Sequence, residues 1–171
     1  MLIIEGIDGV GKTTLVEYLQ NYGMKKYHFD YDSKNMDLLS KYMKVLSIDD
    51  KELVLDRSFI SEMVYGPVIR KTCKLSFEDY TNLLIAYKNM GAKIIYLKAP
   101  KDILLKRRNE DKSDYEIIVN HYEELNNQYD KIMEYSSSFI DVITINTFEE
   151  NIEQVRNHVK KLVIKWLIYV M

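Results

Sequence analysis

The chain has 171 residues, of which 47% are hydrophobic and 29% are charged, and this balance fits a globular domain with a buried core. Its 24 basic and 26 acidic residues give a net charge of −2, so bulk charge supplies no general attraction to nucleic acid or to an anionic membrane. Two prolines and six glycines leave little material for long linkers, and we expect one domain over residues 1–171.

The apolar pattern switches between short runs and helical spacing, which is typical of an α/β fold. Short apolar runs predict strands at residues 2–4, 27–29, 53–55, 94–97 and 142–145. Steps of three and four predict helices at residues 12–22, 34–47, directly after 56, 76–90, 113–132 and after 147. This alternation implies a mostly parallel sheet with helices on both faces.

Capping signals mark several of these helix starts. Pairs of a hydroxyl residue with an acid three positions later occur at Ser76 with Asp79, Ser113 with Glu116 and Thr147 with Glu150.

The apolar runs at both termini and the single cysteine indicate the cellular compartment in which we expect the protein. The N-terminal apolar run meets an acid at Glu5 and has no basic region, so we interpret it as a buried strand rather than a signal peptide. The apolar stretch 162–171 is shorter than the roughly 20 residues that span a bilayer. Cys73 is interpreted as a packing residue. We expect a cytoplasmic protein.

A glycine-rich segment lies between the first predicted strand and the first predicted helix. Residues 6–13 read G-I-D-G-V-G-K-T and fit the pattern G-x-x-x-x-G-K-[ST] in the context that this pattern requires. Glycines let successive N–H groups point at phosphate oxygens, and the start of the helix adds its positive dipole end. We expect the segment to bind ATP through Gly6, Asp8, Gly9, Val10, Gly11, Lys12, Thr13 and Thr14.

The polar residues of this loop have separate expected roles. Lys12 should reach the β- and γ-phosphates, and the Thr13 hydroxyl should bind Mg²⁺. Thr14 is placed to donate to the α-phosphate. The alternatives are a chance match in a turn, or a loop that binds nucleotide without kinase chemistry.

An acid and an arginine follow the third predicted strand. Asp56 comes at the strand's carboxyl end, where it could organise the metal ligands or accept a proton, although Asp also favours helix N-caps. Arg57 could clamp a phosphate or form a surface ion pair. Arg70, thirteen residues further, could clamp the acceptor or favour a helix C-terminus. Tyr65 could stack on a base or pack in the core.

The densely charged segment after the fourth predicted strand is a candidate lid. Arg107 and Arg108 lie in it, and a lid over about residues 107–115 would close arginines over the transferring phosphoryl group. A solvated helix end has the same composition.

These motifs resemble those of thymidylate kinases. Residues 5–14 match the pattern E-G-x-D-G-x-G-K-[ST]-T, and Asp56-Arg57-Ser58 with Ser61 and Tyr65 resembles D-R-[YW]-x-x-S-x-x-A-Y. The D-R-S form is also similar to the E-R-S of deoxynucleoside kinases. The family's Arg-Glu-Pro after the second strand is replaced here by F-D-Y-D at residues 29–32.

The resemblance implies a fold and further roles. It implies a three-layer P-loop fold with the strand order 2-3-1-4-5, and it implies a homodimer. Arg57 would grip the acceptor monophosphate, Asp8 would lie near the sugar 3′-hydroxyl, and Arg107 or Arg108 would be the lid arginine. The predicted reaction is ATP- and Mg²⁺-dependent phosphorylation of a deoxynucleoside monophosphate. The alternatives are a deoxynucleoside kinase, with Asp56 as the base for a 5′-hydroxyl, and a nucleotide-binding protein without catalysis.

Overall fold

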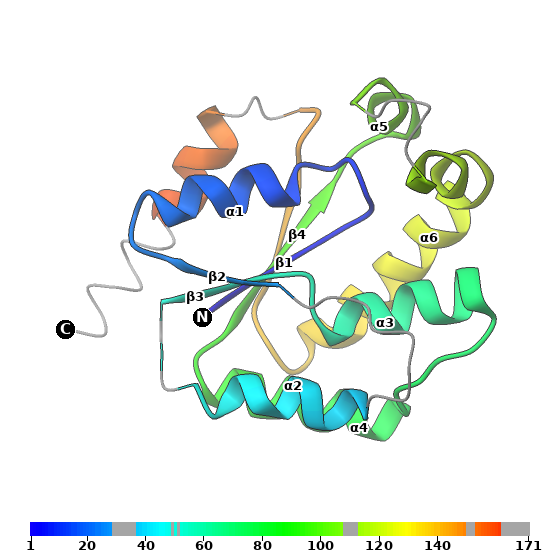
Figure 1. The fold of residues 1–171 in the computed structure, drawn as a ribbon. Helices are drawn as coiled ribbons and strands as arrows, with labels where there is room; N and C mark the ends of the chain where they lie inside the picture. Colours follow the sequence, from blue (N-terminus) through cyan, green and yellow to red (C-terminus); the bar gives the residue numbers. More distant parts are fainter. Residues whose placement is uncertain (29–36, 49, 51, 108–112, 150–152, 162–171) are drawn as a thin grey trace.

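The computed structural model describes residues 1–28, 37–48, 50, 52–107, 113–149 and 153–161. Its centre is a parallel sheet of five strands in the order β2-β3-β1-β4-β5, which confirms the predicted order (Figure 1). The strands are β1 Leu2–Glu5, β2 Lys25–His28, β3 Leu53–Asp56, β4 Lys93–Lys98 and β5 Val142–Asn146. Residues 29–32, where the family motif is replaced, lie outside the described part.

The central strand β1 pairs with β3 on one side and with β4 on the other. Ile4 stands opposite Asp56 of β3 and opposite Ile95 of β4. Both faces of β1 are buried, as its unbroken apolar sequence requires. The pairing brings the carboxyl ends of β1 and β3 side by side, so the two motifs that follow these strands must meet in space.

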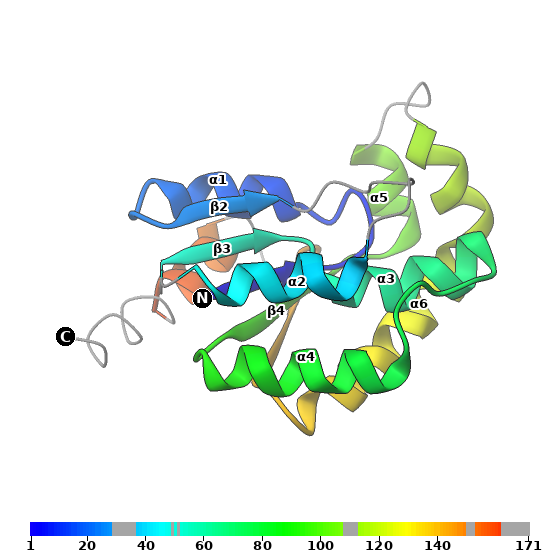
Figure 2. The same cartoon turned by 60° about the horizontal axis from the view of Figure 1, so that its bottom comes forward.

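The helices cover both faces of the sheet. They are α1 Lys12–Gln20, α2 Leu38–Leu46, α3 Phe59–Tyr65, α4 Phe77–Asn89, α5 Lys101–Arg107 and α6 Ser113–Ser137, with a π-helix, η1, at Gly66–Arg70. Helix α1 and the helical segment 153–161 lie on one face, and α2 and α4 lie on the other (Figures 1 and 2). Within the described ranges, none of these helices combines the length and the apolar character needed to cross a membrane.

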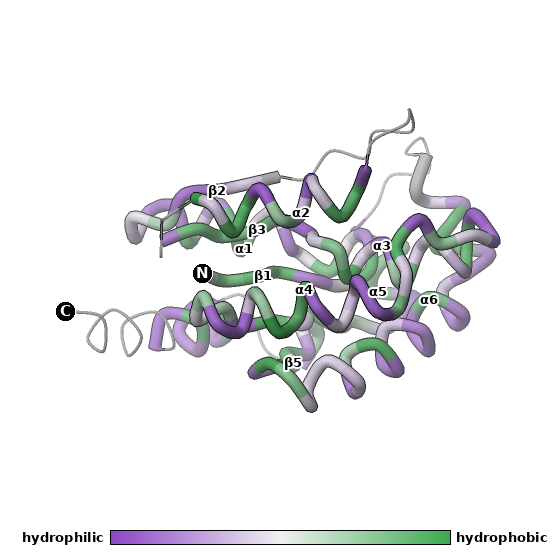
Figure 3. Tube along the Cα trace, turned by 90° about the horizontal axis from the view of Figure 1, so that it is seen from below, coloured by the Kyte–Doolittle hydropathy of each residue, from purple (hydrophilic) through white to green (hydrophobic). Residues whose placement is uncertain are grey.

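Hydropathy follows this layering. Figure 3 shows β1 in the hydrophobic colour at the centre, whereas α4 alternates between hydrophobic and hydrophilic turns. The start of α4 confirms its predicted cap, because Ser76 Oγ accepts a hydrogen bond from the backbone N–H of Asp79 at 3.0 Å.

Two elements differ from the expectation. Helix α5 was not among the predicted helices and overlaps the first part of the charged segment; the buried side chain of Leu104 anchors this short helix. The predicted lid therefore begins at the end of α5 and finishes in α6, and its middle part, 108–112, lies outside the described residues. The π-helix η1 continues α3 and carries Arg70 at its end. At Gly66 an added Cβ would lie 2.9 Å from the carbonyl oxygen of Thr72, so this close approach requires glycine.

A buried aromatic ring joins three helices below the sheet. Phe59 of α3 is fully buried, and its ring centroid lies 5.8 Å from Tyr42 of α2 and 5.6 Å and 5.0 Å from Tyr80 and Tyr87 of α4. Rings at such separations gain from edge contacts in addition to burial. This ring therefore fixes α2 and α4 against the first turn of α3.

Replacing this ring tests its role in stability. Phe59→Ala should lower the free energy of unfolding by about 3–5 kcal/mol, because it leaves a cavity between three helices. Phe77→Ala is the matched control, since that ring is 51% exposed, and it should cost less than about 1 kcal/mol. Urea unfolding measures both variants, and equal losses would show that Phe59 does not join the helices.

Candidate active site

The glycine-rich loop adopts backbone conformations that glycine favours. Gly6, Gly9 and Gly11 have φ angles of 142°, 89° and 98°. At Gly6 the constraint is also steric, since an added Cβ would lie 2.3 Å from the carbonyl oxygen of Leu97. Gly11 is the N-cap of α1 and offers no side chain to cap it, so the positive end of the helix faces the loop. This geometry suits a bound phosphate group.

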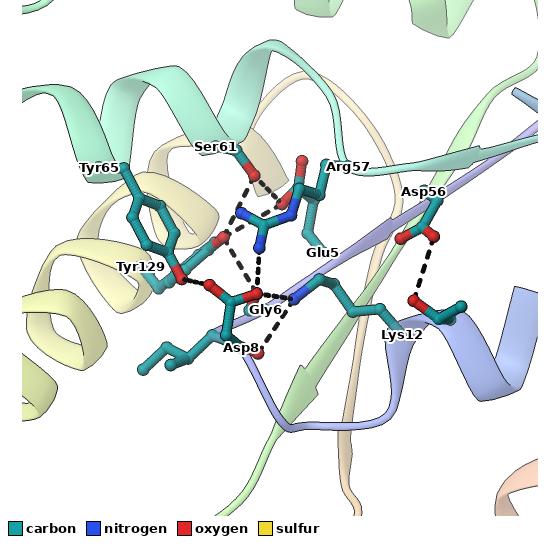
Figure 4. Close-up of polar contacts among 11 residues, drawn as sticks. Glu5, Gly6, Asp8, Lys12, Asp56, Arg57, Ser61, Tyr65 and Tyr129 are labelled. Atoms are coloured by element: carbon teal, nitrogen blue, oxygen red, sulfur yellow. Dashed lines mark hydrogen bonds and ion pairs between the residues drawn. The ribbon is translucent and has the colours of Figure 1, made fainter. Parts of the chain in front are cut away.

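Lys12 folds back over the loop. Its Nζ donates to the carbonyl oxygens of Gly6 at 2.7 Å and Ile7 at 3.0 Å, and it lies 3.5 Å from Asp8 Oδ1 (Figure 4). Burial lowers the pKa of Lys12 to about 8, although the carboxylate of Asp8 opposes this effect. An ammonium group held over the loop is placed to meet phosphate oxygens.

Asp8 joins the loop to the residues that follow β3. Its Oδ1 pairs with Arg57 Nη2, and its Oδ2 accepts a hydrogen bond from the hydroxyl of Tyr65 at 3.0 Å (Figure 4). Burial alone would raise the pKa of Asp8, but the charges of Lys12 and Arg57 outweigh it and hold this pKa below its usual range. Asp8 is therefore an anion that positions Arg57 against the loop.

The backbone of Arg57 is strained at this junction. Its φ of 72° lies in the left-handed region, which costs a residue with a side chain about 1 kcal/mol or more. Its N–H donates to the carbonyl oxygen of Ile4 at 3.1 Å, which continues the pairing of β3 with β1. The guanidinium carbon of Arg57 lies 5.3 Å from the centroid of the Tyr65 ring. The strain and these contacts together orient the guanidinium.

Asp56 and Thr13 bring two oxygen ligands together. Thr13 Oγ1 donates to Asp56 Oδ2 at 3.3 Å, with Asp56 labelled in Figure 4. Lys26 Nζ lies 3.3 Å from the same oxygen. A hydroxyl and a carboxylate are hard oxygen donors of the kind that Mg²⁺ binds beside nucleotide phosphates. The residues present therefore fit a Mg²⁺–nucleotide, with the metal held by Thr13 and Asp56.

The buried carboxylate of Glu5 lies directly before the glycine-rich loop and links it to neighbouring helices. The sequence analysis did not predict this role. Glu5 is fully buried, and its carboxylate accepts hydrogen bonds from Ser58 and Ser61 at 2.8 Å each. The hydroxyl of Tyr129 in α6 lies 3.2 Å from both Glu5 Oε2 and the carbonyl oxygen of Gly6. Burial raises the pKa of Glu5, and the two serine hydroxyls oppose that rise. The signal in the sequence was an acid at the end of a buried strand.

A cavity of about 240 Å³ adjoins this cluster. Its walls come from the loop, α2, α3, η1 and α6, and its lining residues are Asp8, Leu38, Lys41, Tyr42, Arg57, Ser58, Ser61, Glu62, Tyr65, Arg70 and Ile117. Four of the predicted substrate-binding residues therefore share one cavity: Asp8, Arg57, Tyr65 and Arg70. Sequence reasoning did not single out Glu62, whose carboxylate pairs with Arg70.

The remaining predicted residues lie elsewhere. Val10 is buried and Thr14 is exposed in the first turn of α1. Arg107 ends α5 and donates to Thr147, through Nη1 to Oγ1 at 3.0 Å and through Nη2 to the carbonyl oxygen at 2.8 Å. Arg108 lies outside the described residues. The lid role of both arginines stays a prediction.

Comparison with known proteins gave one curated relative and several solved structures. No protein-family model matches the chain. Thymidylate kinase of Campylobacter hominis is 26% identical over 200 aligned positions, which cover 95% of this chain and 99% of that protein. The YorR protein of Bacillus subtilis, solved in complex with phosphorylated GDP, matches with a TM-score of 0.77 at 19% identity, covering 95% of this chain and 94% of that one.

Two solved kinases also share the fold. Deoxyadenosine kinase from M. mycoides, with bound dCTP, has a TM-score of 0.60 at 16% identity and covers 96% of this chain and 100% of its own. Thymidylate kinase of Candida albicans has a TM-score of 0.60 at 12% identity, with 96% and 90% covered. At these identities the likeness concerns the fold.

The sheet order, the glycine-rich loop and the buried lysine over it define the class of the fold: this chain has the three-layer α/β P-loop fold that the solved kinases share. The comparison along almost the whole sequence adds that the chain is similar to a thymidylate kinase, which supports a nucleoside monophosphate kinase and agrees with the two motifs.

Two glycines of the loop allow a matched test of its geometry. Gly11→Ala should cost about 1–2 kcal/mol of stability from its positive φ alone, because no atom lies within 4 Å of the added Cβ. Gly6→Ala should cost at least about 1 kcal/mol more, because its Cβ also collides with the carbonyl of Leu97. Chemical denaturation without nucleotide measures the free energy of unfolding of both variants. Equal losses would mean that the backbone shifts at no cost to remove the collision with Leu97.

Proposed function

We propose that this enzyme transfers the γ-phosphoryl group of ATP to a deoxynucleoside monophosphate, with Mg²⁺ as the metal. The observation that carries the proposal is the cavity beside the glycine-rich loop, since Arg57 lines it and is held against the loop by Asp8. In-line phosphoryl transfer requires that the donor and the acceptor be held side by side, and an arginine between the loop and the cavity is placed to stabilise the transferring charge.

The donor side rests on the loop and its lysine. The backbone N–H groups at the start of α1 bind phosphate oxygens, and Lys12 supplies a positive charge beside them. Thr13 and Asp56 would hold Mg²⁺, because their oxygens lie together at the start of α1 and the end of β3. A metal ion there would neutralise phosphate charge during transfer.

The acceptor side favours a monophosphate. A phosphate already carries a negative charge, so it needs cationic clamping more than deprotonation. Arg57 and Lys41 line the cavity and supply positive charge for such clamping. Tyr65 and Asp8, which bond to each other, are placed to contact the sugar. This set of side chains supports a nucleotide over a neutral nucleoside.

The nucleoside kinase alternative needs a base that reaches a 5′-hydroxyl. Asp56 is the candidate base, but it is absent from the residues that line the cavity and its Oδ2 faces Thr13 and Lys26. These contacts favour a role in holding the metal.

The decisive experiment measures ADP release with ATP·Mg²⁺ against panels of dNMPs, NMPs and deoxynucleosides. We expect turnover with dNMPs that Lys12→Ala abolishes. Turnover with deoxynucleosides alone would instead establish the nucleoside kinase alternative. Tight ATP binding without turnover of any acceptor would establish a nucleotide-binding protein without catalysis.

Arg57 is tested separately from ATP binding. Arg57→Ala should lower kcat/KM for the acceptor by at least about 100-fold, because it removes a cation from the transferring phosphoryl group. The Kd for ATP should stay within a factor of about three, since the loop and Lys12 remain. Arg156→Ala is the control, because that arginine lies over Tyr18 and does not line the cavity. An unchanged rate in Arg57→Ala would remove Arg57 from the site.

A further inference from the structure

A second charged pair lines the acceptor cavity. Glu62 lies in α3 and Arg70 ends η1, and Arg70 Nη2 donates to Glu62 Oε2. The backbone N–H of Lys74 donates to the other carboxylate oxygen, Oε1, at 2.9 Å. Glu62 is only 5% exposed, although it lines the cavity. Two donors from different segments therefore hold a buried carboxylate in one orientation.

This pair presents two complementary hydrogen-bonding groups. An ionised carboxylate accepts hydrogen bonds and donates none, whereas a guanidinium donates and accepts none. Each carboxylate oxygen has two lone pairs, so an oxygen that receives one donor keeps capacity for a second. A ligand that faces both residues must offer an N–H or O–H to Glu62 and an acceptor to Arg70.

The surrounding walls suit a flat, partly apolar group. Leu38 and Tyr42 of α2 line the cavity, as does Ile117 of α6. Tyr42 is held in place by the ring of Phe59, 5.8 Å away. A nucleobase matches such walls because its faces are apolar and its edges carry donors and acceptors. The phosphate of the same ligand would lie at Arg57, beside the loop.

The bases differ in what their edges offer to this pair. Adenine, guanine and cytosine each carry an exocyclic amino group beside a ring acceptor or carbonyl oxygen. Thymine has a single N–H between two carbonyl oxygens, so a carboxylate that faces this N–H also faces two acceptors. A carboxylate oxygen that faces a carbonyl oxygen brings two acceptors together with no hydrogen between them. The thymine carbonyl then loses its hydrogen bond to water and gains none from Glu62, which disfavours dTMP.

From this geometry we propose that Glu62 and Arg70 select the base of the acceptor, and that the enzyme prefers a monophosphate whose base carries an exocyclic amino group over dTMP. The inference rests on the proposed function and narrows its substrate class. Glu62 accepts from the amino group, and Arg70 donates to the neighbouring acceptor atom.

The test compares kcat/KM for dGMP, dCMP, dAMP and dTMP in the wild type and in Glu62→Gln. The wild type should prefer at least one amino-bearing substrate over dTMP by at least about 100-fold. Glu62→Gln should reduce that ratio at least about tenfold, because an amide can donate to a carbonyl of thymine. Glu78→Gln, an exposed change in the first turn of α4, should leave the ratio unchanged.

Each outcome separates base selection from the wider function. Preference for dTMP in the wild type would overturn this inference and leave the monophosphate kinase standing. A Glu62→Gln variant that slows all four substrates equally would show that Glu62 only supports the structure, which also overturns it. Turnover of no monophosphate would overturn the proposed function and this inference with it.

A second variant, Arg70→Lys, tests the same inference if Glu62→Gln does not fold. Arg70→Lys keeps the positive charge beside Glu62 and loses the planar fork of the guanidinium. The ratio of amino-bearing substrate to dTMP should fall in this variant too. An unchanged ratio would show that Arg70 does not contact the base.

Discussion

The ion pair between Asp8 and Arg57 is the contact on which the arrangement of the site depends. It joins the loop after β1 to the turn after β3, two segments that are adjacent because their strands pair. Since Asp8 also lies 3.5 Å from Lys12, one carboxylate faces a cation from each of the two segments, Lys12 and Arg57. The left-handed backbone of Arg57 is tolerated because this network holds it from several directions.

Two buried carboxylates next to the loop differ in their environments. Asp8 is surrounded by cations, and its pKa is held low. Glu5 bonds directly to serine hydroxyls and to Tyr129, and neither these bonds nor the charges of Lys12 and Arg57 offset its complete burial, so its pKa rises. The contrast separates two roles. Asp8 positions charged groups at the site, whereas Glu5 ties the first turn of α3 and the middle of α6 to the start of the loop.

The cavity beside the glycine-rich loop is a product of helix packing. Phe59 fixes α2 and α4 against α3, and the π-helix η1 then carries Arg70 back to Glu62, one turn into α3. A regular helix end at Tyr65 would place Arg70 elsewhere, so the widened turn that Gly66 permits decides what lines the cavity. From the sequence, Arg70 could clamp the acceptor or favour a helix C-terminus. The structure shows that it pairs with Glu62 in the wall of the cavity.

The sequence by itself determined the sheet, the loop and the motif residues Lys12, Asp56 and Arg57, because apolar periodicity and glycine spacing are local signals. Only the tertiary structure decided which distant side chains meet: Glu62 with Arg70, and Glu5 with Tyr129, which lies 124 positions away in the chain. It also decided that α5 forms and that Arg107 bonds to Thr147. Such pairings depend on packing between elements that are far apart in the chain. A local sequence pattern does not show which distant elements will pack together.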